Sequence, residues 1–270
     1  MSDRTEYREI TPSPGLAPFV RCLWHLSGPA EPRRTPQPIV PDGCVEIVLN
    51  CADPFVRVNG GTHRQPPAMV VGQLTGPVVV VPTGVVDVWG IRFHPWTAAA
   101  GLEISVDALR ESTLALDEVL GASLASDLHD GLRDGGSRVL TAALERWLGR
   151  RAPPDRGVRA AVELIAHERT LPSVRAMSAQ LGRSTRWVQR TFRDTVGLSP
   201  KMLSRIGRVQ RAMRLATSRP AKTWSSIAAD VGYFDQSHLV RDFRDIVGVT
   251  PSAFAARERT ITDAFIERLR

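Results

Sequence analysis

The spacing of apolar residues divides the chain into two parts with different periods. Over residues 1–98, short β-branched runs stand between turn signals, at 44–49, 78–81 and 85–93. Turns at Pro41-Asp42-Gly43 and Pro82-Thr83-Gly84 separate these runs. Because no helical period intervenes, the pattern predicts a small β-sandwich or barrel.

From about residue 105 the apolar residues recur at three- and four-residue spacing, which predicts amphipathic helices broken at Gly121 and Gly135-Gly136. Such helices either pack on the β-rich part or pair with a second subunit, and the pattern leaves both open. A charged, proline-containing stretch then reads as a linker, and only helices are predicted beyond it. The predicted units are a β-rich domain with C-terminal helices over 1–150, a linker over 151–157, an all-α domain over 158–256 and a helical tail over 257–270.

One block of sequence occurs twice in the helical part, 51 residues apart. The copies end in Gly197-Leu198-Ser199-Pro200 and Gly248-Val249-Thr250-Pro251. In each copy a short helix ends at a glycine, Gly182 or Gly232, and a longer helix follows. Expected helix caps are Ser173, Ser184, Thr223 and Asp235, and Pro200 suits the first turn of a longer helix. A helix, a tight glycine turn and a second helix form a helix-turn-helix unit.

A wheel of 100° per residue separates an apolar from a polar face on the longer helix of each copy. The apolar faces hold Val188, Phe192 and Thr195 in the first copy, and Leu239, Phe243 and Ile246 in the second. The polar faces hold Arg186, Gln189, Arg190 and Arg193 in the first copy, and Ser237, Arg241 and Arg244 in the second. Two copies with matching faces predict DNA binding far more strongly than one would.

The charge distribution supports the same prediction. Residues 1–150 carry 13 arginines against 17 acidic side chains, a net of −4, whereas residues 151–270 carry 22 basic against 11 acidic side chains, a net of +11. Only the second part is therefore expected to meet a polyanion. We also expect a cytoplasmic protein with no membrane partner, because no apolar run is long enough to span a bilayer and the charged N-terminus lacks a signal-peptide core.

Arginine and glutamine are suited to reading double-stranded DNA. An arginine fork pairs with guanine O6 and N7, and glutamine pairs with adenine N6 and N7. Other arginine and lysine side chains neutralise phosphates without reading sequence.

At this point a resemblance is clear: residues 158–256 resemble the DNA-binding domain of the AraC/XylS family of transcription regulators. The second copy carries the signature as Ile227-Ala228, Gly232-Tyr233, Asp235-x-Ser237, Leu239-x-Arg241-x-Phe243-Arg244 and Gly248-Val249-Thr250-Pro251. The resemblance implies seven helices, two helix-turn-helix units, a connecting helix and RNA polymerase as a partner. It implies regulation of transcription, with activation as the expected sign, and no enzymatic activity.

The resemblance also implies roles for single residues. By position, the base-reading residues are Arg186, Gln189 and Arg190 in the first unit, and Gln236, Ser237 and Arg241 in the second. Phosphate contacts are expected from Arg183, Arg193, Lys201 and Arg244. His238 and Leu239 stand where the signature often has aromatic residues, and both are expected to be packing substitutions.

The connecting helix adds a geometric expectation. Over residues 200–217 it would be about 27 Å long, at 1.5 Å per residue. That length suits two recognition helices placed about one turn of DNA, or 34 Å, apart. One subunit would then read two successive major-groove segments of an asymmetric site.

Residues 7–110 resemble the cupin-like sensor domains found in some AraC-type regulators. The similar residues are Phe19-Val20-x-Cys22-Leu23-Trp24, Pro41-Asp42-Gly43-Cys44 and Gly90-Ile91-Arg92-Phe93-His94-Pro95. The expected fold is thus a two-domain chain with a β-rich cupin-like N-terminal domain and packed helices, followed by an all-α domain. The resemblance implies a small-molecule effector or a homodimer, with Trp24, His25, Glu46, Arg92 and His94 as pocket candidates. The alternative is that the tryptophans are core and the polar residues lie on solvated strand faces.

Two other functions stay open at this stage. Cys22-x-x-His25 with Cys44 and Cys51 offers soft ligands for zinc, or a redox pair, and would suit a DNA-targeted thiol or zinc stress-response or repair protein. The spacing is irregular and small buried cysteines are common, so we expect no metal and no cofactor. The second alternative is a constitutive regulator whose N-terminal domain only dimerises.

Overall fold

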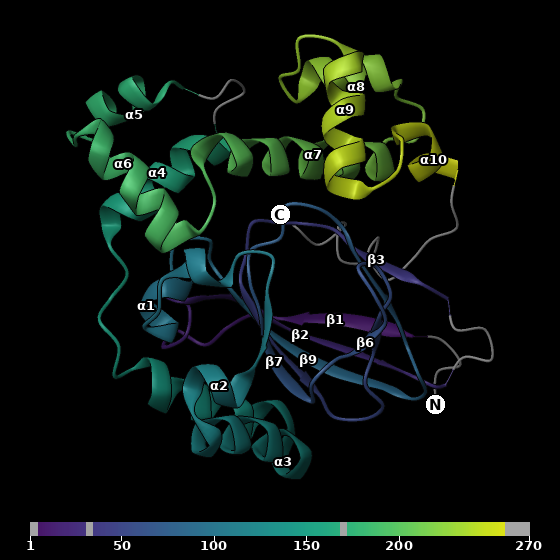
Figure 1. Ribbon diagram of the computed structural model, residues 1–270, viewed down its shortest axis with the longest axis vertical. Helices are drawn as coiled ribbons and strands as arrows, with labels where there is room; N and C mark the ends of the chain where they lie inside the picture. The colour runs from purple at the N-terminus through teal and green to yellow at the C-terminus, as the bar shows by residue number, and fades with distance from the viewer. Residues whose placement is uncertain (1–4, 31–34, 168–171, 257–270) are drawn as a thin grey trace.

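The computed structural model describes residues 5–30, 35–167 and 172–256 and shows a β-rich domain beneath an all-α domain (Figure 1). The strands are β1 (Glu6–Ile10), β2 (Val20–Gly28), β3 (Gln37–Ile39), β4 (Glu46–Asn50), β5 (Val56–Arg57), β6 (His63–Arg64), β7 (Ala68–Val71), β8 (Val78–Val81), β9 (Val86–Phe93) and β10 (Thr113–Ala115). The helices of the first domain are α1 (Ala98–Leu102), the 3-10 helix η1 (Val106–Leu109), α2 (Leu116–Leu120) and α3 (Ala122–Leu148). The strands expected at 44–49, 78–81 and 85–93 correspond to β4, β8 and β9.

The strands form two antiparallel sheets, in the orders β1-β2-β9-β4-β7-β10 and β3-β8-β5-β6. Both faces of the six-stranded sheet are covered. Ile47 and Phe93 point to one face, where they pack with α1, α2 and α3, while Val48 and Met69 point to the other face, toward the four-stranded sheet. The two sheets do not join into one closed barrel among the described residues, so the cupin-like form of this domain stays a prediction.

Glycines shape the helical edge of this domain. Gly121 has φ 81° and separates α2 from α3, as the sequence predicted. At Gly136 the backbone is non-helical, with φ 61° and ψ −155°, so α3 consists of two helices that meet at a kink, where the sequence predicted a break. Leu128, Leu140 and Leu144 are fully buried in the core beneath the six-stranded sheet. Of the two arrangements that the sequence left open, α3 therefore packs on the β-rich domain.

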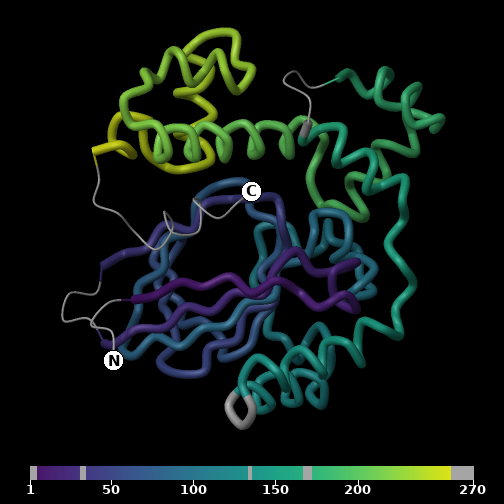
Figure 2. The backbone as a smooth tube through the Cα atoms, turned by 180° about the vertical axis from the view of Figure 1, so that it is seen from behind, coloured from purple at the N-terminus to yellow at the C-terminus, as the bar shows by residue number. Residues whose placement is uncertain are grey.

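The chain then passes along the side of the β-rich domain to the all-α domain (Figure 2). That domain comprises α4 (Arg156–His167), α5 (Val174–Gln180), α6 (Thr185–Thr191), the π-helix η2 (Phe192–Val196), α7 (Pro200–Ser218), α8 (Trp224–Asp230), α9 (Gln236–Val247) and α10 (Pro251–Ala256). With η2 continuing α6, these are the seven helices that the resemblance implied. The expected tail at 257–270 lies outside the described residues.

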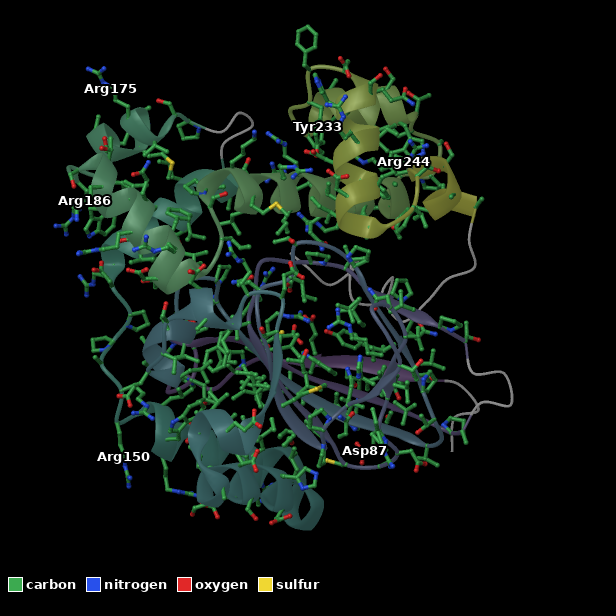
Figure 3. All side chains as sticks on the ribbon, viewed as in Figure 1. Asp87, Arg150, Arg175, Arg186, Tyr233 and Arg244 are labelled. Carbon is green, nitrogen blue, oxygen red and sulfur yellow. The ribbon has the colours of Figure 1, made fainter. Side chains whose placement is uncertain are left out.

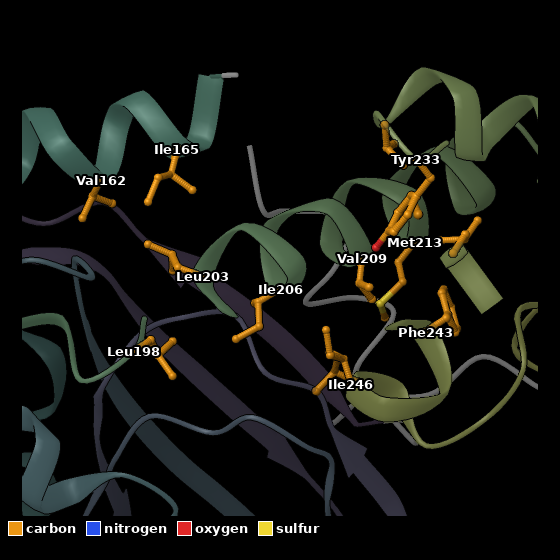
Figure 4. Packing of buried hydrophobic residues seen from close by; sticks show 14 of the residues in the cluster. Val162, Ile165, Leu198, Leu203, Ile206, Val209, Met213, Tyr233, Phe243 and Ile246 are labelled. Carbon is orange, nitrogen blue, oxygen red and sulfur yellow. The ribbon is translucent and has the colours of Figure 1, made fainter. Parts of the chain in front are cut away.

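The connecting helix α7 forms the axis of the all-α core. At one end it packs with α4 through Val162 and Ile165, and at the other its Met213 lies with Phe243 of α9 (Figure 4). The 19 residues of α7 span about 28 Å, close to the length predicted from sequence. Because both helix-turn-helix units share this core, their relative positions follow from the packing on α7.

The β-rich domain contacts both units and the helix between them. A Cβ atom placed on Gly197 would lie 2.7 Å from Val106, and one placed on Gly248 would lie 2.9 Å from Pro77. Val40 belongs to the buried core of the all-α domain. The β-rich domain is thus packed against the helical domain rather than tethered to it. Among the described residues, no helix is both long and apolar enough to cross a membrane.

Candidate nucleic-acid interface

Each helix of the two repeated units begins at a side-chain cap. The hydroxyls of Ser173, Ser184 and Thr223 and the carboxylate of Asp235 accept hydrogen bonds from the backbone N–H three residues on, as the sequence predicted. Pro200 occupies the first turn of α7. Both turn glycines have positive φ, 60° and 84°. Local sequence therefore builds α5–α6 and α8–α9 as helix-turn-helix units.

The first recognition helix, α6, presents the side chains that the wheel predicted. Arg186, Gln189 and Arg190 are exposed, while Val188 is fully buried. Arg186 points away from the protein at the outer edge of the domain (Figure 3). Among the described residues no ion pair engages Arg186 or Arg190, so both guanidinium groups are free to meet a base or a phosphate.

One predicted core position on this helix is wrong. Thr195 is only partly buried, whereas its neighbour Val196 is fully buried. The cause is η2, where the backbone winds as a π-helix over Phe192–Val196. A π-turn takes one residue more than an α-turn, so the inward position moves one residue along the chain.

The second recognition helix, α9, is a regular α-helix with both predicted faces in place. Leu239, Phe243 and Ile246 are fully buried. The predicted reading residues Gln236, Ser237 and Arg241 are exposed. Of the two expected packing substitutions, Leu239 is in the core but His238 is not: its side chain is 53% exposed, because it lies on the outer turn beside the Asp235 cap.

The predicted phosphate-binding residues are all exposed, and two of them are held by neighbours. The Arg183 guanidinium lies 5.3 Å from the centre of the Trp187 ring, and Arg193 Nε donates to Asp194 Oδ1 at 2.9 Å. That hydrogen bond raises the pKa of Arg193. Lys201 and Arg244 are exposed as well, and Lys201 shares with Arg241 a surface hollow of about 370 Å³ between α7 and the start of α9.

Sequence reasoning missed the group that fixes α9 on α7. Asp242 Oδ1 accepts a hydrogen bond from Arg205 Nε at 2.8 Å, and Asp242 Oδ2 accepts one from the Tyr233 hydroxyl at 3.0 Å. The guanidinium of Arg208 lies 3.7 Å from the same carboxylate. The available signal was a pair of acidic residues, Asp242 and Asp245, next to the arginines of α9, and Asp242 marks an internal contact rather than a reading position.

The β-rich domain encloses a cavity of about 440 Å³ between its two sheets. The cavity is mainly apolar, and a smaller cavity of about 130 Å³ adjoins it. Of the five predicted pocket residues, Trp24 and Glu46 line both cavities and Arg92 lines the smaller one. Gly90 makes room for the tryptophan, since a Cβ atom there would lie 1.8 Å from Trp24 Cε2.

The two predicted pocket histidines lie outside both cavities. His25 Nε2 lies 2.8 Å from Asp87 Oδ1, and the His25 ring stacks on Trp89. His94 Nε2 lies 3.1 Å from the Ala17 carbonyl oxygen, and burial lowers the pKa of His94. Both histidines are therefore held in structural contacts.

A buried charge cluster closes the inner end of the smaller cavity. Arg92 Nε donates to Glu46 Oε1 and lies 3.2 Å from Asp42 Oδ2, while Arg92 Nη1 lies 3.7 Å from Glu9 Oε1. Burial raises the pKa of Glu46, and the Arg92 guanidinium opposes that shift. Burial alone would lower the pKa of Arg92, but the carboxylates of Glu46 and Asp42 raise it, so the guanidinium stays charged.

The cysteines do not gather into a metal site. No group of three or more histidine, cysteine, aspartate or glutamate side chains in the described part of the chain is arranged to hold a metal ion. Cys22, Cys44 and Cys51 form no disulfide in the described part of the chain. Burial raises the pKa of Cys22 to about 12 and also raises the pKa of Cys44, which disfavours the reactive thiolate.

Two protein families match separate parts of the chain. Residues 177–257 match the family described as a helix-turn-helix domain. Residues 8–115 match a family described as a domain of unknown function (DUF6597). A search of curated proteins found no match.

Several solved structures are similar. The C-terminal domain of AraT, a response regulator from Geobacillus stearothermophilus, is 24% identical over 40% of this chain and 90% of its own, with a TM-score of 0.36. A probable AraC family transcriptional regulator from Rhodopseudomonas palustris is 28% identical over 39% of this chain and 100% of its own, with a TM-score of 0.35. ToxT from Vibrio cholerae is 8% identical over 86% of this chain and 97% of its own, with a TM-score of 0.49.

The signature motif, the two capped helix pairs with exposed basic faces and the helix-turn-helix family match agree on the second domain. The C-terminal part of the chain is an AraC-type helix-turn-helix domain of DNA-binding transcription regulators, and it follows an N-terminal DUF6597 domain.

Proposed function

We propose that the protein reads two successive major-groove segments of one asymmetric DNA site. The observation that carries this proposal is the pair of exposed faces on α6 and α9, which lie toward opposite ends of α7 (Figure 1). The length of α7, about 28 Å, approaches the 34 Å of one DNA turn. Arg186, Gln189 and Arg190 read bases in the first segment, and Gln236, Ser237 and Arg241 read bases in the second.

An arginine substitution tests base reading directly. Arg190→Ala is expected to weaken binding to a selected duplex by about 1–3 kcal/mol while changing binding to unrelated DNA little. Arg150→Ala is the matched control, because Arg150 is exposed on the β-rich side, far from Arg186 (Figure 3). Fluorescence anisotropy over a range of salt concentrations measures the affinity of each variant for the selected duplex and for unrelated DNA. An equal loss on both DNAs with a shallower salt slope would assign Arg190 to phosphate contact instead.

We further propose that a small molecule bound in the β-rich domain controls DNA binding. The 440 Å³ cavity supports this, because it has the size of a ligand site and its mainly apolar walls also carry polar groups, among them Glu46, Arg57 and Arg64. It favours effector control over a constitutive regulator, whose N-terminal domain needs no cavity. A compound that binds the cavity yet leaves DNA affinity and promoter output unchanged would contradict the proposal.

Activation of transcription through RNA polymerase and a homodimer complete the proposed function. Both come from the family resemblance. Promoter output measured with and without the protein gives the sign of regulation, and light scattering of the purified chain gives its oligomeric state. A DNA-targeted thiol or zinc protein is the weaker candidate, since the buried thiols of Cys22 and Cys44 have raised pKa values.

A further inference from the structure

The turn Pro41–Cys44 lies between the cavities of the β-rich domain and the connecting helix α7. On its inner side, Asp42 and Cys44 line the smaller cavity. On its outer side, the Pro41 carbonyl oxygen accepts a hydrogen bond from Gln210 Nε2 of α7 at 2.6 Å. Gly43, with φ 82°, faces α7 so closely that a Cβ atom there would lie 2.8 Å from Leu203 Cδ1. The same four residues therefore touch both the ligand space and the DNA-binding domain.

Two buried glutamines hold this turn from opposite sides. Gln210 comes from α7, and Gln73 comes from the segment after β7, where its Nε2 donates to the Gly43 carbonyl oxygen at 2.8 Å. Gln73 is fully buried, and its side chain also lies 3.2 Å from the Cβ position of Gly197, at the end of the first helix-turn-helix unit. A shift of the turn must therefore strain or break contacts with α7 and with the first unit.

The inner side of the turn carries three carboxylates against two guanidinium groups. Asp42, Glu46 and Arg92 are the charged residues that line the smaller cavity, and Glu9 lies on the other side of Arg92. The second guanidinium is that of Arg21, whose Nη1 lies 3.9 Å from Cys44 Sγ on the same turn. Asp42 Oδ2 is buried and forms an ion pair with Arg92 Nε at 3.2 Å, but it accepts no hydrogen bond among the described residues. The carboxylates thus outnumber the guanidinium groups by one, and Asp42 Oδ2 can still accept a hydrogen bond from a ligand.

The walls around these carboxylates are apolar. The two cavities share Trp24, Leu26, Ile39, Glu46, Val71 and Leu74. A ligand that spans both cavities would place its body against aliphatic side chains and its head at Asp42 and Glu46. A positively charged head group gains from the carboxylates and from the nearby Trp24 ring, whereas an anionic one is repelled.

From these observations we propose that the inner cavity binds the cationic group of an apolar organic molecule between Asp42 and Glu46, and that Pro41–Cys44 transmits this binding to α7. The cation competes with Arg92 for Asp42, so the Asp42 side chain turns toward the ligand and carries the backbone of Pro41 and Gly43 with it. The contacts of that backbone with Gln210 and Leu203 change in consequence. This inference rests on the proposed effector control and specifies its ligand class and its route.

Three probes with one indole body test the ligand class on the full-length chain. Tryptamine carries an amine, indole-3-propionate a carboxylate and tryptophol a hydroxyl. We expect tryptamine to raise the melting temperature most, with the shift lost in Glu46→Gln and kept in Glu118→Gln, because Glu118 is exposed on α2 and lines neither cavity. An equal or larger shift with indole-3-propionate, no shift with any probe, or an undiminished tryptamine shift in Glu46→Gln would overturn the assignment.

A double-mutant cycle tests the route without any ligand. Asp42→Asn is expected to change the hydrogen exchange of residues 200–218, and the DNA dissociation constant, by about fivefold or more, the lower end of measured allosteric couplings. In a Gln210→Met background, where the hydrogen bond to Pro41 is absent and only the contact of Gly43 with Leu203 remains, the same substitution should have a clearly smaller effect. Glu118→Gln is the control and should leave both quantities unchanged, because Glu118 is exposed on α2. Equal effects of Asp42→Asn in both backgrounds would overturn the route.

Failure of the proposed function and failure of the proposed route would give different results. If the full-length protein selects no specific DNA sequence, the proposed function fails, while hydrogen exchange over residues 200–218 still decides whether Asp42 and α7 are coupled. If DNA binding is specific but the cycle is additive, the function stands and the proposed route fails.

Discussion

Replacing Asp242 by alanine removes the carboxylate that holds the second recognition helix on the connecting helix. The side chain is 14% exposed and lies within the reach of two arginines and a tyrosine. It accepts one hydrogen bond from Arg205 at 2.8 Å and one from Tyr233 at 3.0 Å. Its loss leaves the guanidinium of Arg208 without its acidic neighbour on that side.

The magnitude follows from these contacts. A hydrogen bond to a charged group contributes about 1.5–3 kcal/mol, and breaking a fully buried pair costs more. The side chains of Arg205 and Arg208 are 23% and 18% exposed, so water partly replaces the lost partner. We therefore expect Asp242→Ala to lower the free energy of unfolding by about 2–3 kcal/mol. Asp245→Ala is the matched control, since Asp245 pairs with the same Arg205 but is 53% exposed and should cost under about 1 kcal/mol.

Urea unfolding followed by tryptophan fluorescence measures the stability of both variants. DNase footprinting on a selected duplex then measures the effect on DNA. We expect Asp242→Ala to shorten the footprint, because α9 loses its fixed position on α7, while Asp245→Ala leaves the footprint intact. Equal free energies of unfolding for the two variants, or a full-length footprint with Asp242→Ala, would refute the claim that Asp242 fixes α9 on α7.

Three further perturbations give smaller, separate effects. Gly207→Ala should raise the free energy of unfolding by about 0.5–1 kcal/mol, because Gly207 lies inside α7 and a methyl group there meets only Arg211 Nη1, at 3.7 Å; a lower urea midpoint would contradict this. Burial lowers the pKa of His94 below the value of about 6.5 expected in the unfolded chain. As the pH falls through about 6.5, the unfolded chain therefore binds a proton on this side chain before the folded protein does, and the folded protein loses stability. His94→Gln should flatten that loss in unfolding curves between about pH 7.5 and 5, and an unchanged slope would be evidence against it. Finally, Cys22 and Cys44 should react with iodoacetamide more slowly than the partly exposed Cys51 near about pH 8, as mass spectrometry of the labelled peptides would show; faster labelling of either would favour the thiol-based alternative.

The helical domain could be predicted from sequence because its signals are local. A cap such as Ser184 and a turn glycine such as Gly182 act within a few residues. The buried residues Val188 and Phe192 lie four positions apart, which is helical spacing. The error at Thr195 shows the limit of that approach. A wheel assumes one fixed angle per residue, and the π-helix at Phe192–Val196 breaks the assumption without a marker in the sequence.

The β-rich domain was harder to predict because its arrangement depends on distant pairings. β2 pairs with both β1 and β9, and the sequence carries no local sign of which strands become neighbours. The resemblance to cupin-like sensor domains gave the neighbours Trp24 and His25 as pocket candidates. Neighbouring residues on a strand point to opposite faces, so Trp24 lines the cavity and His25 stacks on Trp89 instead.

Contacts between the two domains had no counterpart in the sequence analysis. Gln73 and Gln210 carry no family signature and lie far from Gly43 along the chain, yet all three meet at one turn. Pro41-Asp42-Gly43 was recognised as a turn, but only packing shows that it touches α7. Functional coupling of this kind is a property of the folded pair of domains.

Selection of bound sequences from random duplex DNA by the full-length protein is the sharpest test of reading by two helix-turn-helix units. We expect two blocks of enriched bases whose centres lie about 10–10.5 base pairs apart, in an asymmetric site. Repeating the selection with Arg190→Ala should relax one block, and with Arg241→Ala the other. A single block, a palindrome, or no enrichment over unrelated DNA would contradict reading by two unequal helix-turn-helix units in one chain.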